Sequence, residues 1–177
     1  MQILVIGMDE RQGLISQFCY KIQNLLGEKT KIIYQERLSH ECEGIINADL
    51  IITFNLLGFE QSTLTGGVFY NLLNCKQIHF VLDRNLPNEC CLKLPLSIAM
   101  FFYCINDEYY EYLLNQYMDI PYLKSLNIRS ADERNESFIV NALCNAVCEV
   151  LKMCTMYGRC GRHLLSAKLM YRNDVNT

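Results

Sequence analysis

The sequence predicts an α/β domain in which helices cover a mainly parallel sheet of about five or six strands. Apolar runs cover residues 2–7, 49–55, 77–82 and 98–104, and each run ends in polar residues. A strand that is apolar on both faces is typical of the interior of a parallel sheet. Segments with helical spacing separate several of these runs, which favours a three-layer arrangement with right-handed crossovers.

The first half of the chain begins with a strand and then a helix. Apolar residues recur at helical spacing over 12–26, and Gly27 follows as the expected C-cap. Residues 31–34 read as a short strand, and 36–47 as a polar helix or loop. After the strand that begins near Asp49, residues 56–66 are expected to form a loop. The glycine pair Gly66-Gly67 is then expected to open a short helix through Leu73.

The second half continues the alternation. Two prolines mark 85–95 as a loop, and Asn106 is the expected N-cap of a helix over 107–117. Residues 122–126 predict a short sixth strand. A long apolar helix is predicted over 136–156.

Length and composition indicate one Rossmann-like domain. The chain has 177 residues, of which 51% are hydrophobic and 20% charged, and this balance argues against disorder. We place the domain at 1–156 and a basic tail at 157–177. Such a tail either contacts phosphates, lipid or an acidic partner, or is a solvated helix end. The basic residues of this end are Lys152, Arg159, Arg162, Lys168 and Arg172.

Charge and hydropathy exclude several classes of protein. The formal net charge of -3 disfavours nucleic acid as a general partner. No apolar run reaches the roughly 18–20 residues of a membrane span, and no signal peptide is recognisable, so we expect a cytoplasmic protein. The ten cysteines are then expected to be reduced thiols. Cys154, Cys160 and His163 cluster loosely but do not make up the four ligands of a zinc site, so no metal is expected. The first turn matches neither the dinucleotide nor the phosphate-loop motif, and no cofactor is expected.

The candidate site follows from the ends of the strands. Parallel sheets bind ligands at the carboxyl ends of their strands, so polar residues and glycines at those ends are the predicted ligand-binding residues. Asp9 and Asn55 are expected to contact ligand hydroxyls, and the glycine pair is expected to allow close approach of the backbone. The predicted set is Asp9, Asn55, Gly66, Gly67, Asp83, Arg84 and Asn106.

Other reactive side chains point less clearly to chemistry. His79 lies inside a strand and is expected to pack in the core. Tyrosines are dense over 103–122, where their rings suit sugar stacking, a protein interface or ordinary packing. Cys90 and Cys91 are adjacent and oxidisable, although nothing near them in the sequence activates a thiolate. No catalytic triad is recognisable, so the sequence leaves open whether the protein is an enzyme.

Three segments, taken in order, resemble a known family. They are 48–55 (ADLIITFN), 75–83 (CKQIHFVLD) and 100–113 (MFFYCINDEYYEYL), followed by a short strand-like segment at 120–123. Residues 49–126 thereby resemble the N-terminal Rossmann-like domain of CgeB-type (spore-maturation) bacterial glycosyltransferases.

The resemblance implies binding of a sugar or nucleotide-type ligand, including a nucleotide-sugar. Members of that family have two Rossmann-like domains, and the second usually carries the nucleotide-sugar contacts. This chain has room for one such domain, so the resemblance implies that it is not a complete transferase alone but a solitary acceptor-side domain, a partner subunit or a divergent binding module.

Two alternatives stay open. The segments 48–52 (ADLII) and 65–70 (TGGVFY) are similar in layout to nucleoside 2-deoxyribosyltransferases, but Val68 stands where an acidic nucleophile is expected. The protein would then be a small enzyme acting on nucleosides. In the second alternative, the tyrosine-rich segment and the long helix make a non-catalytic homodimer.

Overall fold

Six parallel strands form one sheet in the computed structural model, which describes residues 2–7, 13–27, 30–34, 42–60, 66–83, 86–128 and 135–157. The strands are β1 (Ile3–Gly7), β2 (Thr30–Tyr34), β3 (Leu50–Phe54), β4 (Lys76–Val81), β5 (Met100–Cys104) and β6 (Leu123–Ser125). The helices are α1 (Gly13–Leu26), α2 (Cys42–Ile46), α3 (Asp107–Gln116) and α4 (Glu136–Tyr157), with 3-10 segments η2 (Phe69–Leu72) and η3 (Glu89–Lys93). The predicted α/β class, parallel sheet and long C-terminal helix are confirmed.

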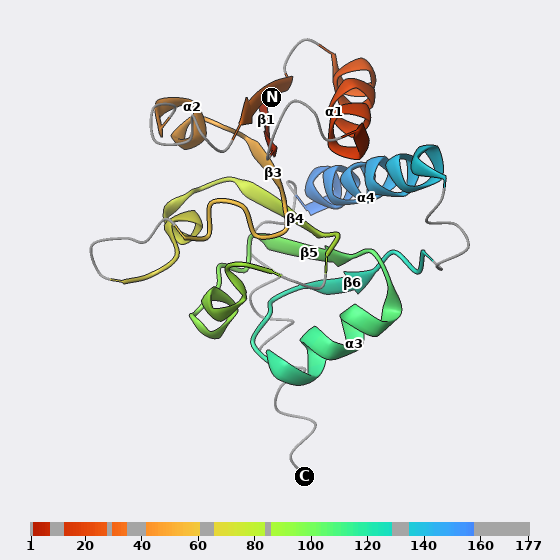
Figure 1. Cartoon of the computed structure of the whole chain (residues 1–177). Helices are drawn as coiled ribbons and strands as arrows, with labels where there is room; N and C mark the ends of the chain where they lie inside the picture. Colours follow the sequence, from red (N-terminus) through yellow and green to blue (C-terminus); the bar gives the residue numbers. More distant parts are fainter. Residues whose placement is uncertain are drawn as a thin grey trace. The chain divides into compact units, whose positions relative to one another are not determined.

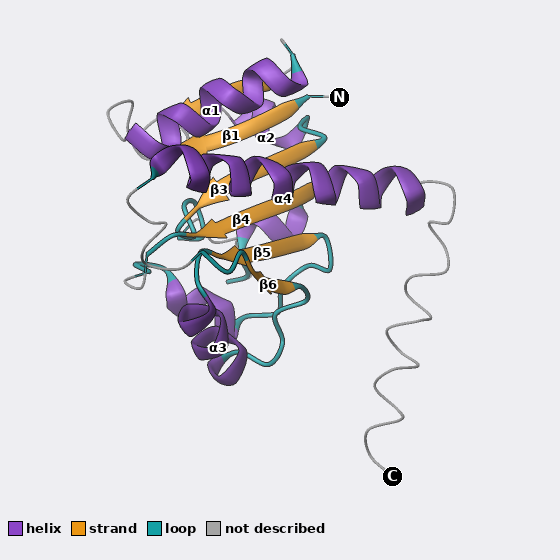
Figure 2. Ribbon diagram, turned by 90° about the vertical axis from the view of Figure 1, so that its right-hand side faces the viewer, coloured by secondary structure: helices purple, strands orange, loops and turns teal. Residues whose placement is uncertain are grey.

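The order of the strands is β2-β1-β3-β4-β5-β6. In the register of the sheet, Ile3 of β1 lies opposite Thr30 on one side and Leu50 on the other. Figure 2 shows β1, β3, β4, β5 and β6 side by side in this order. The chain therefore moves outward from β1 to β2 and then returns across β1 to continue with β3. The direction of strand addition reverses between β1 and β3, which makes this position the topological switch point of the sheet.

Burial follows position in the sheet. Every residue of β1 and β3 is buried, as expected for strands covered on both faces. The edge strand β2 mixes buried and exposed residues, and the other edge strand, β6, has no buried residue. The sequence runs with the most continuous apolar character therefore became the centre of the sheet.

One face of the sheet packs on α1. Buried residues of α1 recur at helical spacing and include Phe18, which is fully buried. The Phe18 ring packs edge-on against Phe54 of β3 and Phe80 of β4, with ring centroids 5.3 and 5.7 Å away. Figure 1 shows α1 on one side of the strands and α2 on the other. These three phenylalanines form the centre of the α1-side core.

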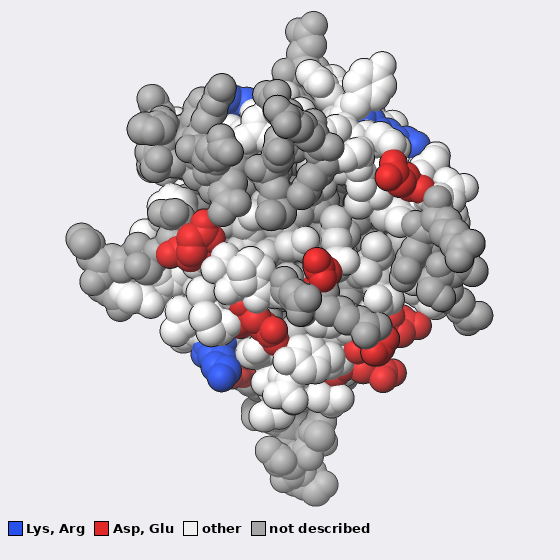
Figure 3. All heavy atoms as spheres, viewed as in Figure 1, with Lys and Arg blue, Asp and Glu red and all other residues white. Residues whose placement is uncertain are grey.

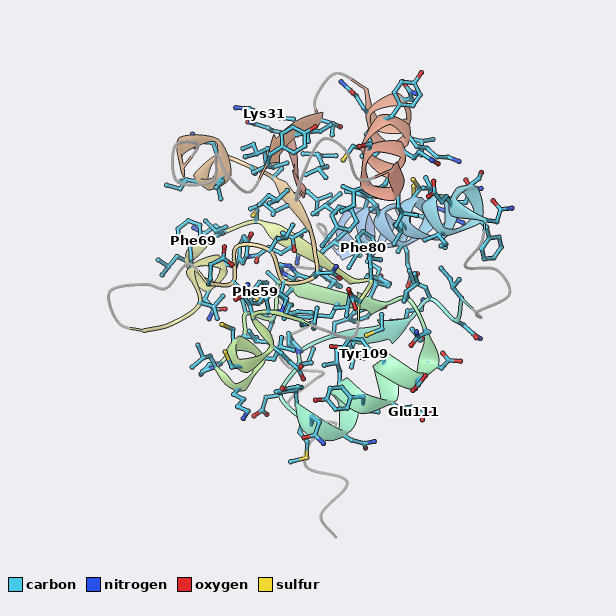
Figure 4. All side chains as sticks on the ribbon, in the orientation of Figure 1. Lys31, Phe59, Phe69, Phe80, Tyr109 and Glu111 are labelled. Atoms are coloured by element: carbon cyan, nitrogen blue, oxygen red, sulfur yellow. The ribbon has the colours of Figure 1, made fainter. Side chains whose placement is uncertain are left out.

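The opposite face holds a second aromatic cluster. Because side chains alternate along a strand, His79 points away from its neighbour Phe80. Its ring lies 4.9 Å from both Phe59 and Phe102 and 5.5 Å from Tyr70, measured between centroids. Phe59 and Phe80 are labelled in Figure 4. The segment that follows β3 and the 3-10 segment η2 therefore supply the cover for this face.

Two predicted helix caps are confirmed. Gly27 has φ +80° and its N–H donates to the carbonyl of Gln23 at 2.8 Å, which closes α1 with a left-handed residue. The Asn106 side-chain oxygen accepts from the N–H of Tyr109 at 2.8 Å and caps α3. Both caps were predictable because they depend on local sequence alone.

Two other local predictions need correction, and a third agrees with the residues that the structure describes. The short helix expected to open at the glycine pair is the 3-10 segment η2, which begins at Phe69 after the N-cap Val68. The loop expected at 85–95 contains η3, and β5 begins at Met100 because residues 98–99 form a turn. Within 36–47, the structure describes a short helix, α2, and residues 35–41 lie outside the described part.

The chain consists of two compact units, Met1–Cys144 and Asn145–Thr177, so the boundary falls inside α4. The whole sheet and α1 to α3 belong to the first unit. Of the predicted tail 157–177, only Tyr157 lies within the described residues. Among the helices that the structure describes, none combines the length and apolar character needed to cross a membrane.

Candidate functional site at the carboxyl edge of the sheet

The carboxyl ends of all strands meet at one edge because the sheet is parallel throughout. The described termini there include Gly7 of β1, Phe54 of β3 and Val81 of β4. The switch point lies at this edge between β1 and β3, where doubly wound sheets bind ligands. Asp9 and Arg84 of the predicted site lie outside the described residues.

Asn55 joins the ends of β3 and β4. Its N–H donates to the carbonyl of Phe80 at 2.7 Å. Its side-chain oxygen accepts from the N–H groups of Leu82 at 2.7 Å and Asp83 at 3.1 Å. The predicted contact between Asn55 and a ligand hydroxyl stays a prediction, but the geometry gives this oxygen a second role, because it fixes the backbone that carries Asp83.

Backbone strain is concentrated just after β3. Asn55 has φ +47° and Leu56 has φ +58°, both in the left-handed region. Asparagine tolerates this region, whereas a branched side chain such as leucine is an outlier there. Leu56 is fully buried, so packing holds it in place. Strain of this kind clusters at binding sites, which makes the end of β3 a functional candidate on structural grounds.

The loop after β3 is tied to the loop after β4. The Asn88 amide donates to the carbonyl of Leu56 at 3.3 Å and to the Glu60 carboxylate at 2.8 Å. The Cys91 thiol donates to the carbonyl of Phe59 at 3.5 Å. These contacts hold the two loops together, and sequence reasoning did not find them because the partners come from distant segments.

Asp83 and Asn106 end neighbouring strands. Asp83 is exposed just past the end of β4, and Asn106 is half-buried just past the end of β5. The N–H of Ile105 donates to the carbonyl of Val81 at 3.0 Å, which holds the two strand ends together. Asn106 already uses its side-chain oxygen to cap α3. Asp83 is the more accessible of the two to a ligand, because it is exposed whereas Asn106 is half-buried.

The glycine pair takes no part in a helix N-terminus. Gly66 has φ +80°, and no heavy atom lies within 4 Å of the position that a Cβ would occupy. Gly67 is half-buried and precedes Val68, the N-cap of the four-residue η2. A 3-10 segment this short offers few aligned N–H groups to an anion. The expected role in ligand binding stays a prediction for both glycines, but its proposed helical basis is wrong.

Carboxylates surround the described edge. Glu60 is exposed in the segment after β3, Asp83 is exposed just past the end of β4, and Glu89 lies half-buried in η3. The first two turns of α3 add Asp107, Glu108 and Glu111, all exposed. Figure 3 shows acidic side chains gathered where Figure 1 places α3. Among the described residues of this edge, the carboxylates repel phosphate and favour hydroxyl or amino groups, which donate hydrogen bonds.

A carboxylate also stands at the amino end of α1. Gln17 donates to Glu136 at 2.6 Å, and the carboxylate of Glu136 lies 3.6 Å from the position that a Cβ on Gly13 would take. In doubly wound folds the amino end of the first helix is where phosphates bind. The negative charge of Glu136 opposes a phosphate there, which agrees with the acidic character of the rest of the edge.

Glu89 organises part of the tyrosine-rich segment. It accepts a hydrogen bond from the Tyr117 hydroxyl at 2.8 Å. A hydrogen bond to Glu89 also raises the pKa of Tyr112. Tyr112 stacks on the buried Tyr109 at 5.7 Å, and 44% of Tyr112 is exposed. Figure 4 labels Tyr109 beside α3. The tyrosines thus bind α3 to η3, and the Tyr112 ring stays accessible.

His79 is a core residue, as its sequence context predicts. It is fully buried, its Nδ1 lies 2.8 Å from the Thr53 hydroxyl, and Nε2 has no hydrogen-bond partner. Burial lowers its pKa from 6.5 to about 3, so the ring is neutral at physiological pH. Within the described part of the chain, no three His, Cys, Asp or Glu side chains come together as a metal site.

The fold and this edge define a doubly wound α/β protein with an acidic carboxyl edge. Comparisons with protein-family models, curated proteins and solved structures find no match to the chain. Its function must therefore be argued from its own geometry.

The strain beside the site gives a stability prediction. A Cβ on Gly58 would lie 2.4 Å from the Tyr70 hydroxyl, which is buried and donates to the carbonyl of Leu57. Gly58 also has φ +80°. We expect Gly58→Ala to lower the free energy of unfolding by about 3 kcal/mol or more, from the left-handed backbone and the overlap together. Urea denaturation measures this loss.

Gly66→Ala is the matched control. Gly66 has the same φ of +80° but open space at the Cβ position. We therefore expect this variant to lower the free energy of unfolding by about 1–2 kcal/mol, from the backbone alone. The difference between the two losses of unfolding free energy measures the cost of the overlap with Tyr70. Equal losses would show that the ring moves aside at no cost, against the packing described here.

Proposed function

We propose that this protein binds a sugar, or the sugar part of a nucleoside or nucleotide-type ligand, at the carboxyl edge of its sheet. The observation that carries the proposal is Asp83, an exposed carboxylate that ends β4 on backbone held by Asn55. A carboxylate accepts hydrogen bonds from vicinal hydroxyls, and charge-assisted bonds of this type are about twice as strong as neutral ones.

The position of Asp83 supports the same proposal. It ends the strand next to β3, one strand away from the switch point, where open α/β sheets bind ligands. The acidic edge favours the hydroxyl-bearing part of a ligand over its phosphates. Free sugars and nucleosides are therefore expected to bind more tightly than nucleotide-sugars with the same sugar.

A transferase-like role is proposed only in combination with a partner. The first compact unit holds one doubly wound sheet, and the resemblance to CgeB-type glycosyltransferases implies a second domain that carries nucleotide contacts. The chain would then supply one side of the site. A ligand-binding protein without catalysis satisfies the same observations.

The test is a thermal-shift screen of the full chain against free sugars, nucleosides and nucleotide-sugars. A ligand that binds only the folded state adds about 2.7 kcal/mol of stability at a concentration of a hundred times its Kd. We expect a hit in the first two classes and loss of most of its shift in Asp83→Asn. This substitution leaves the backbone bond to Asn55 in place.

Asp119→Asn is the control, because Asp119 is an exposed carboxylate in the turn after α3, away from the strand ends. It is expected to keep the full ligand shift. If Asp83→Asn binds as tightly as the wild type, Asp83 is not the acceptor and the proposal fails. A flat screen together with a stable dimer in light scattering would favour an interaction protein instead.

A further inference from the structure

Cys90 and Cys91 form a pair of neighbouring thiols on η3. Both are free, Cys90 is exposed and Cys91 is half-buried. The Cys91 thiol lies 3.5 Å from the carbonyl of Phe59, and its sulfur is within hydrogen-bonding reach of Cys90. The label of Phe59 in Figure 4 marks where this contact lies. Two sulfur atoms are therefore held side by side at the surface of the first unit.

A direct disulfide between them is disfavoured by geometry. The described backbone contains no cis peptide bond, and a trans peptide places adjacent Cα atoms about 3.8 Å apart. Disulfides usually need a Cα separation of about 4.4–6.8 Å. A bridging atom between the sulfurs enlarges the ring by one atom and relieves this mismatch. The pair is thus better suited to chelate a third atom than to close a disulfide between its own two sulfurs.

The charges around Cys90 and Cys91 determine which kind of atom the two sulfurs can bind. Burial first, then Cys90 and Glu60, raise the pKa of Cys91, so its neutral thiol dominates at pH 7. A cation held by two thiolates would need two deprotonations next to the Glu60 carboxylate. The described residues offer no third ligand for a metal that needs three or four. An atom that forms an uncharged product with two thiols needs neither a pair of thiolates beside Glu60 nor a third ligand.

We propose that Cys90 and Cys91 together capture a trivalent organoarsenical as a two-sulfur chelate. An arsenic(III) oxide, R–As=O, reacts with both thiols to give R–As(S)2 and one water. Two As–S bonds form, two S–H bonds and the As=O bond break, and both protons leave in the water. No oxidation state changes, and the product is neutral, so the neighbouring Glu60 carboxylate does not oppose it.

The experiment uses phenylarsine oxide as the probe. The reduced full chain is incubated with it and then with excess glutathione, a monothiol that strips arsenic held by one sulfur. Alkylation with iodoacetamide in urea removes protection by burial, and mass spectrometry of peptides locates unmodified cysteines. We expect Cys90 and Cys91 to stay unalkylated together, and the dithiol 2,3-dimercaptopropanol to restore their alkylation.

Single substitutions test whether both sulfurs are needed. In Cys90→Ser, at an exposed position, Cys91 is expected to lose its protection completely, and Cys91→Ser is expected to do the same for Cys90. Cys148→Ser is the matched control and keeps the pair protected. Protection of Cys91 in Cys90→Ser, or full alkylation of both cysteines in the treated wild type, would overturn the proposal.

Discussion

Phe80→Ala is expected to lower the free energy of unfolding by about 3–5 kcal/mol, the range for removing a fully buried phenylalanine. The Phe80 ring lies 5.7 Å from Phe18, 5.6 Å from Phe54 and 5.9 Å from Tyr103, between centroids. Alanine leaves a cavity that these rings cannot fill, since they belong to α1 and to neighbouring strands. Urea denaturation followed by circular dichroism measures the loss.

Phe138→Ala is the control, because 47% of Phe138 is exposed. A loss of less than about 1 kcal/mol is expected there, as for most surface substitutions. Similar losses in the two variants would contradict the assignment of Phe80 to the centre of the α1-side core.

The Phe80→Ala variant also probes the candidate site. The carbonyl of Phe80 accepts the N–H of Asn55, whose side chain holds Asp83. Loosening β4 at Phe80 is therefore expected to weaken any ligand that binds through Asp83, at temperatures where the variant is still folded. Packing in the core and order at the carboxyl edge are linked through one backbone hydrogen bond.

The central sheet was predictable because its strands are apolar on both faces. The strands β1, β3 and β5 carry no charged residue, so their pattern identifies them without reference to neighbours. The caps at Gly27 and Asn106 were predictable for a similar reason, since each depends on a few adjacent residues. The two outer strands, β2 and β6, were also predicted. The only sign in the sequence that they lie at the edges of the sheet is that their patterns are short or alternating.

The site was predictable only in outline. The predicted strand ends identified Asn55, Asp83 and Asn106 as candidates. The hydrogen bond by which the Asn55 side chain holds the backbone of Asp83, however, depends on the pairing of β3 with β4. Glu89 gave no signal, because its contacts with Tyr112 and Tyr117 form only when η3 meets α3. The prediction at the glycine pair was wrong because glycines permit a helix start without requiring one.

Acidification is expected to destabilise the protein through His79. The sequence predicts a core histidine, but its partner Thr53 follows from the register, which places Thr53 opposite His79. Burial lowers the pKa of His79 from 6.5 to about 3. The folded state therefore excludes a proton that the unfolded state binds below pH 6.5. The stabilising effect is complete above that pH and is lost progressively as the pH falls towards 3.

The magnitude is large for one side chain. A shift of this size corresponds to about 4–5 kcal/mol, and stability is expected to fall by about 1.4 kcal/mol per pH unit within the window from this residue alone. Domains of this kind have about 5–15 kcal/mol in total, so His79 by itself brings the fold close to unfolding at the acid end. Urea denaturation at a series of pH values between about 7.5 and 4 measures the slope.

The double variant Thr53→Val, His79→Leu separates this effect from the protonation of carboxylates. It replaces both partners of the buried hydrogen bond with apolar groups of similar size, so neither is left unsatisfied. Its stability near neutral pH can differ in either direction, but its slope between about pH 6 and 4 is expected to be shallower than that of the wild type by about 1.4 kcal/mol per pH unit. Parallel slopes would mean that His79 gains its proton without unfolding, which the aromatic cluster around it does not allow.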